Sequence, residues 1–219
     1  MDRSGDVFKH ANAFGTSKHG GVLLVAGDDH ACKSSTLPHQ SEHIFDAAMI
    51  PVLYPTGVQD ILELGLHGIA MSRYSGCYVA FKCISDTVDA SASVLIDIDS
   101  PKILLPQDFK LPEAGVSIRW PDTPLDQELR LQHDKIYAAL AYCRANKLNR
   151  ITIGTTSASD SGKPARLGII ASGKSYLDRA DLCLRQRALN KTTRRSIHER
   201  SRRRSQRTGL APVLPTARF

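Results

Sequence analysis

A cluster of polar side chains surrounds a short apolar run near the start of the chain. The run, residues 22–26 (VLLVA), does not alternate with polar residues, which is typical of a strand buried on both faces of a parallel sheet. Open α/β sheets bind their ligands at the carboxyl ends of the strands. The flanking residue types therefore predict a cofactor- or substrate-binding site. The candidates are Lys18 and His19 before the run, and Asp28, Asp29, His30, Ser34, Ser35, His39 and Gln40 after it.

The segment His39–His43 (HQSEH) also matches HxxEH, the inverted zinc-protease signature. On a helix, His39 and His43 would share one face and could bind Zn²⁺, with Glu42 as the general base. Pro38 places His39 in the first turn of the expected helix, where the geometry is irregular. We favour a polar helix start that faces a ligand, and we expect the chain to hold no metal; a zinc hydrolase stays as an alternative.

A second motif, Gly168–Ser175 (GIIASGKS), satisfies the P-loop pattern GxxxxGK[ST]. In a P-loop, backbone N–H groups surround a phosphate and the lysine neutralises its charge. The context is unfavourable, because an expected strand at residues 166–170 overlaps the first half of the motif. We favour a strand that turns into a helix through a glycine, and a nucleotide-binding protein stays as a second alternative.

The positive charge of the chain is concentrated at its C-terminal end. The formal net charge is +7, but residues 181–219 contain 11 of the 29 Lys and Arg residues and only two acids, Asp181 and Glu199. The remaining 180 residues are nearly neutral. This basic tail lacks interleaved aromatic residues and apolar periodicity, so we expect it to be disordered, and we expect no nucleic-acid partner.

The five cysteines show no CxxC spacing, and no secretion signal precedes them. Reduced thiols in a cytoplasmic protein are the simplest interpretation. No apolar run approaches the roughly 18 residues that span a membrane, so no membrane partner is expected.

Apolar patterns predict alternating helices and strands in the first part of the chain. We expect an α/β fold with a parallel sheet, because strands that alternate with helices form such sheets. The expected helices are residues 4–14, 38–49 and 57–74, and the expected strands are 22–26, 50–54 and 78–84.

The pattern changes after residue 84. A long Ser-, Asp- and Pro-rich connection follows, with strand-like pieces at 93–98 and 103–105, and then a strong helix at 126–147. A Ser/Gly/Lys loop is expected at 155–165, a strand at 167–170 and the start of a helix at 172–178.

Several segments resemble the indolepyruvate:ferredoxin oxidoreductases of the long, single-chain bacterial type. The resemblance covers about residues 1–178. The segments are DRSGDVFKHAN (2–12), GTSKHGGVLLVAGDDHACKSSTLPHQSEH (15–43), AMIPVLYPTGVQDILELGLHG (48–68), SRYSG (72–76), IRWPDTP (118–124), RANKLNRI (144–151) and LGIIASGKSYLD (167–178).

The resemblance implies an oxidoreductase that decarboxylates indolepyruvate or other aryl 2-oxo acids. Such enzymes use thiamine diphosphate with Mg²⁺, pass electrons through [4Fe-4S] clusters to ferredoxin, and form an acyl-CoA. The implied organisation is the C-terminal half of a pyrimidine-binding domain at 1–110, a connector with a long helix at 111–165, the start of a transketolase-C-terminal-like domain at 166–180, and a basic tail at 181–219.

This chain departs from the family pattern in two respects. The glutamate that activates the cofactor lies before the first matching segment in the family, and residues 27–29 (GDD) lack the correctly spaced asparagine of a diphosphate site. After residues 175–178 (SYLD) the family continues as an apolar helix, whereas this chain becomes basic. We therefore expect a fragment of the enzyme with a frame-shifted tail, which supplies one wall of the cofactor site, holds no cofactor alone and is inactive by itself.

Overall fold

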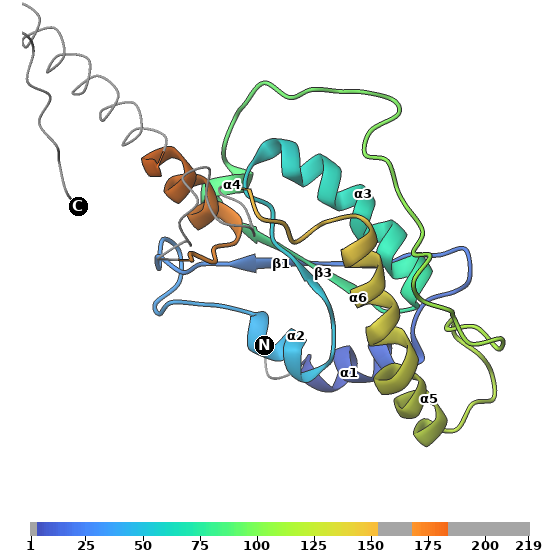
Figure 1. The fold of residues 1–219 in the computed structure, drawn as a ribbon. Helices are drawn as coiled ribbons and strands as arrows, with labels where there is room; N and C mark the ends of the chain where they lie inside the picture. Colours follow the sequence, from blue (N-terminus) through green and yellow to red (C-terminus); the bar gives the residue numbers. More distant parts are fainter. Residues whose placement is uncertain (1–3, 153–167, 184–219) are drawn as a thin grey trace, which may run out of the picture. The chain divides into compact units, whose positions relative to one another are not determined.

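The computed structural model describes residues 4–152 and 168–183 (Figure 1). The chain divides into two units, residues 1–174 and 175–219. The expected loop at 155–165 and nearly all of the basic tail lie outside the described residues. In the described part, no helix is both long enough and apolar enough to cross a membrane.

A three-stranded parallel sheet forms the centre of the first unit, which confirms the α/β class (Figure 1). Its strands are β1 (Leu23–Asp28), β2 (Val52–Leu53) and β3 (Val79–Ile84), in the order β1-β3-β2. The central strand β3 is the most apolar and the most buried, with Val79 and Ala80 fully inaccessible to solvent. All three strands fall within or next to the apolar runs that predicted them.

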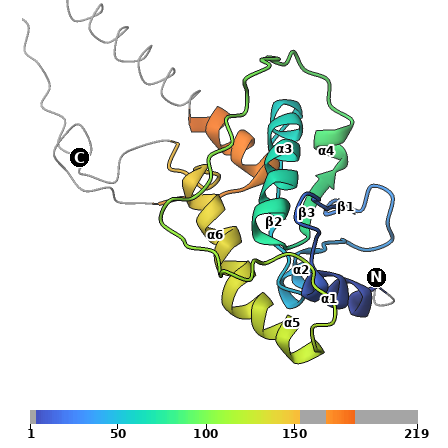
Figure 2. The same ribbon diagram turned by 90° about the vertical axis from the view of Figure 1, so that its right-hand side faces the viewer.

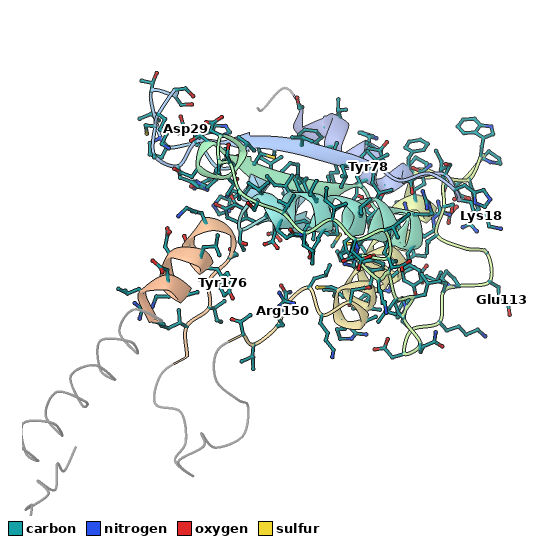
Figure 3. The ribbon with its side chains drawn as sticks, turned by 90° about the horizontal axis from the view of Figure 1, so that it is seen from above. Lys18, Asp29, Tyr78, Glu113, Arg150 and Tyr176 are labelled. Atoms are coloured by element: carbon teal, nitrogen blue, oxygen red, sulfur yellow. The ribbon has the colours of Figure 1, made fainter. Side chains whose placement is uncertain are left out.

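Helices cover both faces of the sheet, as the view from above shows (Figure 3). On one face, α3 (Val58–Ser75) and α6 (Ile136–Ala145) pack in a core that contains Met71, Phe81 and Tyr142. On the other face, α1 (Gly5–Phe14) and α2 (Glu42–Ala47) contribute Phe8 and Phe45 to a second core. The two cores hold the sheet in place.

Helix α3 ends at a glycine that the structure requires. Gly76 has a φ of +73° in the left-handed region, and its N–H donates to Ser72 O at 2.9 Å. A Cβ added to Gly76 would collide with the backbone carbonyl of Val116. Both the backbone conformation and the lack of space therefore select glycine at this helix end.

We expect Gly76→Ala to destabilise the protein by about 2 kcal/mol or more, because alanine is strained at this φ and its methyl group meets a backbone oxygen. Gly65→Ala is the matched control: Gly65 lies inside α3, and a Cβ there has open space. This control should gain roughly 0.5–1 kcal/mol from helix propensity. Urea unfolding followed by circular dichroism measures both changes, and equal shifts of the two variants would contradict the role of Gly76.

The helix expected at 126–147 is confirmed as one uninterrupted helical segment, residues 124–145 (Figure 2). Its first part, α5 (Pro124–Arg130), has Thr123 as N-cap, and the threonine side chain accepts a hydrogen bond from Asp126 N. A π-helical turn, η1 (Leu131–Lys135), joins α5 to α6. This turn places Lys135 fully inside the protein, where its ammonium donates to Ala13 O at the end of α1 and burial lowers its pKa to about 8.

Four expected elements differ in the structure. The helix expected at 38–49 forms only as α2, because residues 39–40 belong to a loop. Residues 93–98 and 103–105 are not strands; they belong to a long connection, residues 89–123, which we call the strap. The strap runs past α3 (Figure 1), where Leu95 exchanges two hydrogen bonds with the Gln59 side chain. The described part of the strand expected at 167–170, residues 168–170, has no strand partner.

Two helical segments complete the description. A short helix, α4 (Ser85–Val88), directly follows β3 and was not expected from the sequence. Residues 173–183 are helical, which extends the helix start expected at 172–178.

Candidate functional site

A buried ion pair lies at the carboxyl edge of the sheet. Lys82 pairs with Ala26 in the β1–β3 register, and Asp28 lies two residues further along β1, so both side chains emerge on the same face. The Lys82 ammonium lies 3.1 Å from Asp28 Oδ2. The side chains of Lys82 and Asp28 are 1% and 0% exposed, so this pair is fully removed from water.

Two further side chains surround the Lys82 ammonium. It donates to Glu42 Oε1 at the start of α2, and it lies 4.6 Å from the ring centroid of Tyr54. Glu42 is 44% exposed and forms the outer side of the cluster. Burial opposes ionisation of Glu42, but the hydrogen bond from Lys82 prevails and holds the pKa of this carboxyl below its ordinary value. The site thus combines one cation with two carboxylates; we call Asp28, Glu42 and Lys82 the edge cluster.

Two polar atoms in this region are buried without a hydrogen-bond partner among the described residues. One is Asp28 Oδ1, and the other is the hydroxyl oxygen of Ser41. The second oxygen of Asp28 is fully engaged, because it accepts from Ser41 N at 3.1 Å in addition to its contact with Lys82. Buried polar atoms are rarely left unpaired, so these two atoms indicate a place where a ligand can bond.

Histidines approach the same carboxylate. His39 Nδ1 lies 3.6 Å from Asp28 Oδ1. Asp28, His30 and Glu42 each offer one atom that could bind a metal, and these three atoms lie within 4.8 Å of one another. The structure therefore brings His30 and His39, two of the predicted site residues, close to Asp28.

Asp29, Ser34 and Ser35 organise the loop that carries His30. The Asp29 carboxylate accepts hydrogen bonds from the backbone N–H groups of Lys33, Ser34 and Ser35 and from the Ser34 hydroxyl. These bonds, the one from Ser34 N foremost, hold the pKa of Asp29 far below its ordinary value. The Asp29 carboxylate therefore bonds within its own loop. We assign Asp29, Ser34 and Ser35 a structural role in this loop.

The backbone of Asp29 also fixes the position of His39. The two residues form an antiparallel bridge through two backbone hydrogen bonds of 3.2 and 3.0 Å. Gln40 lies between this bridge and the start of α2. His39 therefore precedes the helix instead of lying in its first turn.

Lys18 and His19 lie far from the edge cluster. They belong to the turn that precedes β1, whereas Asp29 directly follows this strand, and Figure 3 shows the labelled Lys18 and Asp29 at opposite ends of the sheet. A six-residue strand separates the two ends by roughly 20 Å. The structure does not bring Lys18 and His19 together with the other candidates.

The helical geometry behind the HxxEH interpretation is not formed. Because His39 is part of the bridge, it does not share a helix face with His43. His43 and Glu42 instead line an open hollow of about 470 Å³, together with Asp46, residues 49–52 and Ile136 of α6.

The P-loop interpretation also lacks its expected context. Residues 168–172 form no regular structure, and the helix begins at residue 173. A P-loop joins a strand to a helix, and no strand is present in the described part of this segment.

Lys82 is the site residue that sequence reasoning missed. It stands in an otherwise apolar strand, YVAFKCI at residues 78–84, and its side chain is only 1% exposed. A charged residue inside a buried strand needs a partner of opposite charge. This requirement for a partner was the signal in the sequence that could have identified Lys82.

Comparisons with known proteins supply no family assignment. No family model, no curated protein and no solved structure matches this chain.

Proposed function

We propose that the chain is part of a thiamine-diphosphate-dependent 2-oxoacid:ferredoxin oxidoreductase that acts on indolepyruvate or another aryl 2-oxo acid. In this proposal the carboxyl edge of the sheet forms one wall of the cofactor and substrate site. The proposal is supported by the resemblance of residues 15–43, because this segment also supplies most of the polar groups around the edge cluster.

The edge cluster is the observation that carries the proposal. Burying Lys82 and Asp28 costs desolvation free energy, and an apolar pair of similar volume would often stabilise the fold as well or better. Buried charges with specific partners are concentrated at functional sites. Lys82 and Asp28 lie at the carboxyl edge of a parallel sheet, which is the edge at which α/β proteins bind ligands.

Asp28 and Ser41 fit one part of a cofactor-binding site. Asp28 Oδ1 is a buried acceptor, and the Ser41 hydroxyl is both a donor and an acceptor, so the wall offers hydrogen bonds to polar atoms of a cofactor or substrate. When bound, thiamine diphosphate supplies the nucleophilic carbon and the electron sink for decarboxylation. The chain's own residues orient the reactants and exclude water.

The residues do not fit an iron–sulfur cluster. Within residues 4–152 and 168–183, no group of three cysteines lies close enough to share a metal centre. In the proposal, the [4Fe-4S] clusters and the contacts with CoA and ferredoxin belong to other segments of the enzyme.

Apolar side chains on the surface support packing against further polypeptide. Val25 on the edge strand β1 is 71% exposed, and Trp120 in the strap is 86% exposed. In the described part of the chain, no strand pairs with the outer edge of β1. Exposed apolar surface and an open sheet edge are typical of surfaces that another segment covers.

The nucleotide sequence around the coding region tests the proposal. We expect an upstream frame to encode the pyrimidine-domain glutamate, and a shifted frame to continue residues 175–178 (SYLD) as an apolar helix. Sequencing of the locus and its transcript measures both. If neither segment is found, the assignment as part of this oxidoreductase is wrong.

A further inference from the structure

We infer that the edge cluster and His30 form a binding site for a divalent transition-metal ion, with Zn²⁺ as the best-suited probe. The ligands are Asp28, His30 and Glu42. One ligating atom from each residue lies within 4.8 Å of the others, which is a separation that a small shift of side chains converts into shared coordination. This inference does not depend on the proposed function, and it departs from the expectation that the chain holds no metal.

One oxygen of Asp28 lacks a hydrogen bond, because its contact with His39 Nδ1, at 3.6 Å, is longer than a hydrogen bond. Asp28 is fully buried, and its Oδ1 has no hydrogen-bond partner among the described residues. A buried carboxylate oxygen without a hydrogen bond is costly, because the desolvation of its charge is only partly compensated by a more distant contact. A metal ion at this position would satisfy Oδ1.

Lys82 contacts both carboxylate ligands and fixes their direction. Its ammonium contacts Asp28 Oδ2 and Glu42 Oε1, whereas Asp28 Oδ1 carries no hydrogen bond. Carboxylates that ligate metals are themselves commonly hydrogen-bonded by a second group that fixes their direction. The ion pair is therefore compatible with metal binding.

The charge balance favours a cation with an open position. Two carboxylates and one ammonium give the edge cluster a net charge of −1, so the site attracts a cation. Three protein ligands of imidazole and carboxylate type suit Zn²⁺ and leave the fourth tetrahedral position for water or an anionic oxygen. His30 is exposed at the loop surface, which gives the ion a path to the site.

Metal binding to the full chain tests the inference. The purified chain, freed of metal with a chelator, is titrated with Zn²⁺ by calorimetry and with Co²⁺ by visible absorption. We expect one ion per chain, and an increase in Kd of at least about 10-fold on His30→Ala and on Asp28→Asn. The exposed His30 variant keeps the test valid if Asp28→Asn fails to fold.

His43→Ala is the matched control, because His43 lies on α2 next to Glu42 but outside the ligand set. We expect this variant to bind Zn²⁺ as the unaltered chain does. The absence of stoichiometric binding would overturn the inference. A loss on His43→Ala equal to that on His30→Ala would also overturn it, in favour of the HxxEH ligands.

Discussion

Replacing Lys82 with methionine is expected to destabilise the protein by about 3–5 kcal/mol. The substitution keeps the length and most of the volume of the side chain but removes the ammonium. Asp28 would remain fully buried with only the Ser41 N–H as a hydrogen-bond partner, and Glu42 would lose its counter-charge. Urea unfolding at neutral pH, followed by circular dichroism, measures the change in the free energy of unfolding.

Two variants separate loss of the buried pair from a general effect of losing a lysine. Lys33→Met breaks an ion pair with Asp86 whose side chains are both about half exposed, so it should leave stability nearly unchanged. Adding Asp28→Asn to Lys82→Met removes the orphaned charge and should recover much of the loss. If Lys82→Met is as stable as the unaltered chain, the edge cluster does not have the buried geometry described here.

Regular patterns in the sequence predicted the elements that position the site. The unalternated apolar runs at 22–26 and 78–84 became β1 and β3. The apolar run of β3 is explained by its burial on both faces. The expectation that residues 22–26 are buried on both faces was wrong, because β1 is an edge strand on which Val25 is 71% exposed. The apolar stripe at 57–74 became α3, whose one face packs on the sheet. The predictions of these elements succeeded because each depended on a local pattern of apolar residues.

The site itself was predictable only in part. Asp28, His30 and His39 were identified from their place after a strand, but the same argument also selected Lys18 and His19, which precede it. Distance along the chain did not distinguish the two ends of the strand, whereas the direction of a parallel strand does.

Contacts between residues far apart in the sequence explain why the other features of the site were not predicted. Pro38 favoured a helix that would include His39, but the bridge between His39 and Asp29 delays the helix until Glu42. Asp29 looked like a ligand, yet its carboxylate bonds to three N–H groups of its own loop. Lys82 was not identified because its partners, Asp28 and Glu42, are 54 and 40 residues away in the sequence. Such pairings arise only when the sheet has formed.

The largest effect on activity is expected from His30 in the proposed oxidoreductase, assembled with the upstream and downstream segments that the proposal requires (the restored enzyme). With thiamine diphosphate, Mg²⁺, CoA and a dye acceptor, His30→Ala should lower kcat/KM for an aryl 2-oxo acid by about 100-fold or more, as the loss of one positioned polar group does in many active sites. His19→Ala is the matched control, because His19 lies before β1, at the opposite end of the sheet. It should change kcat/KM by less than about 3-fold.

Turnover of an aryl 2-oxo acid, measured as reduction of the dye acceptor, is the most direct test of the proposed function. We predict no turnover by the 219-residue chain alone, turnover by the restored enzyme, and loss of that turnover on His30→Ala but not on His19→Ala. Turnover by the isolated chain would contradict the proposal that it supplies one wall of a larger site. A restored enzyme that is inactive, or one that is insensitive to His30→Ala, would contradict the assignment of that wall to the carboxyl edge of the sheet.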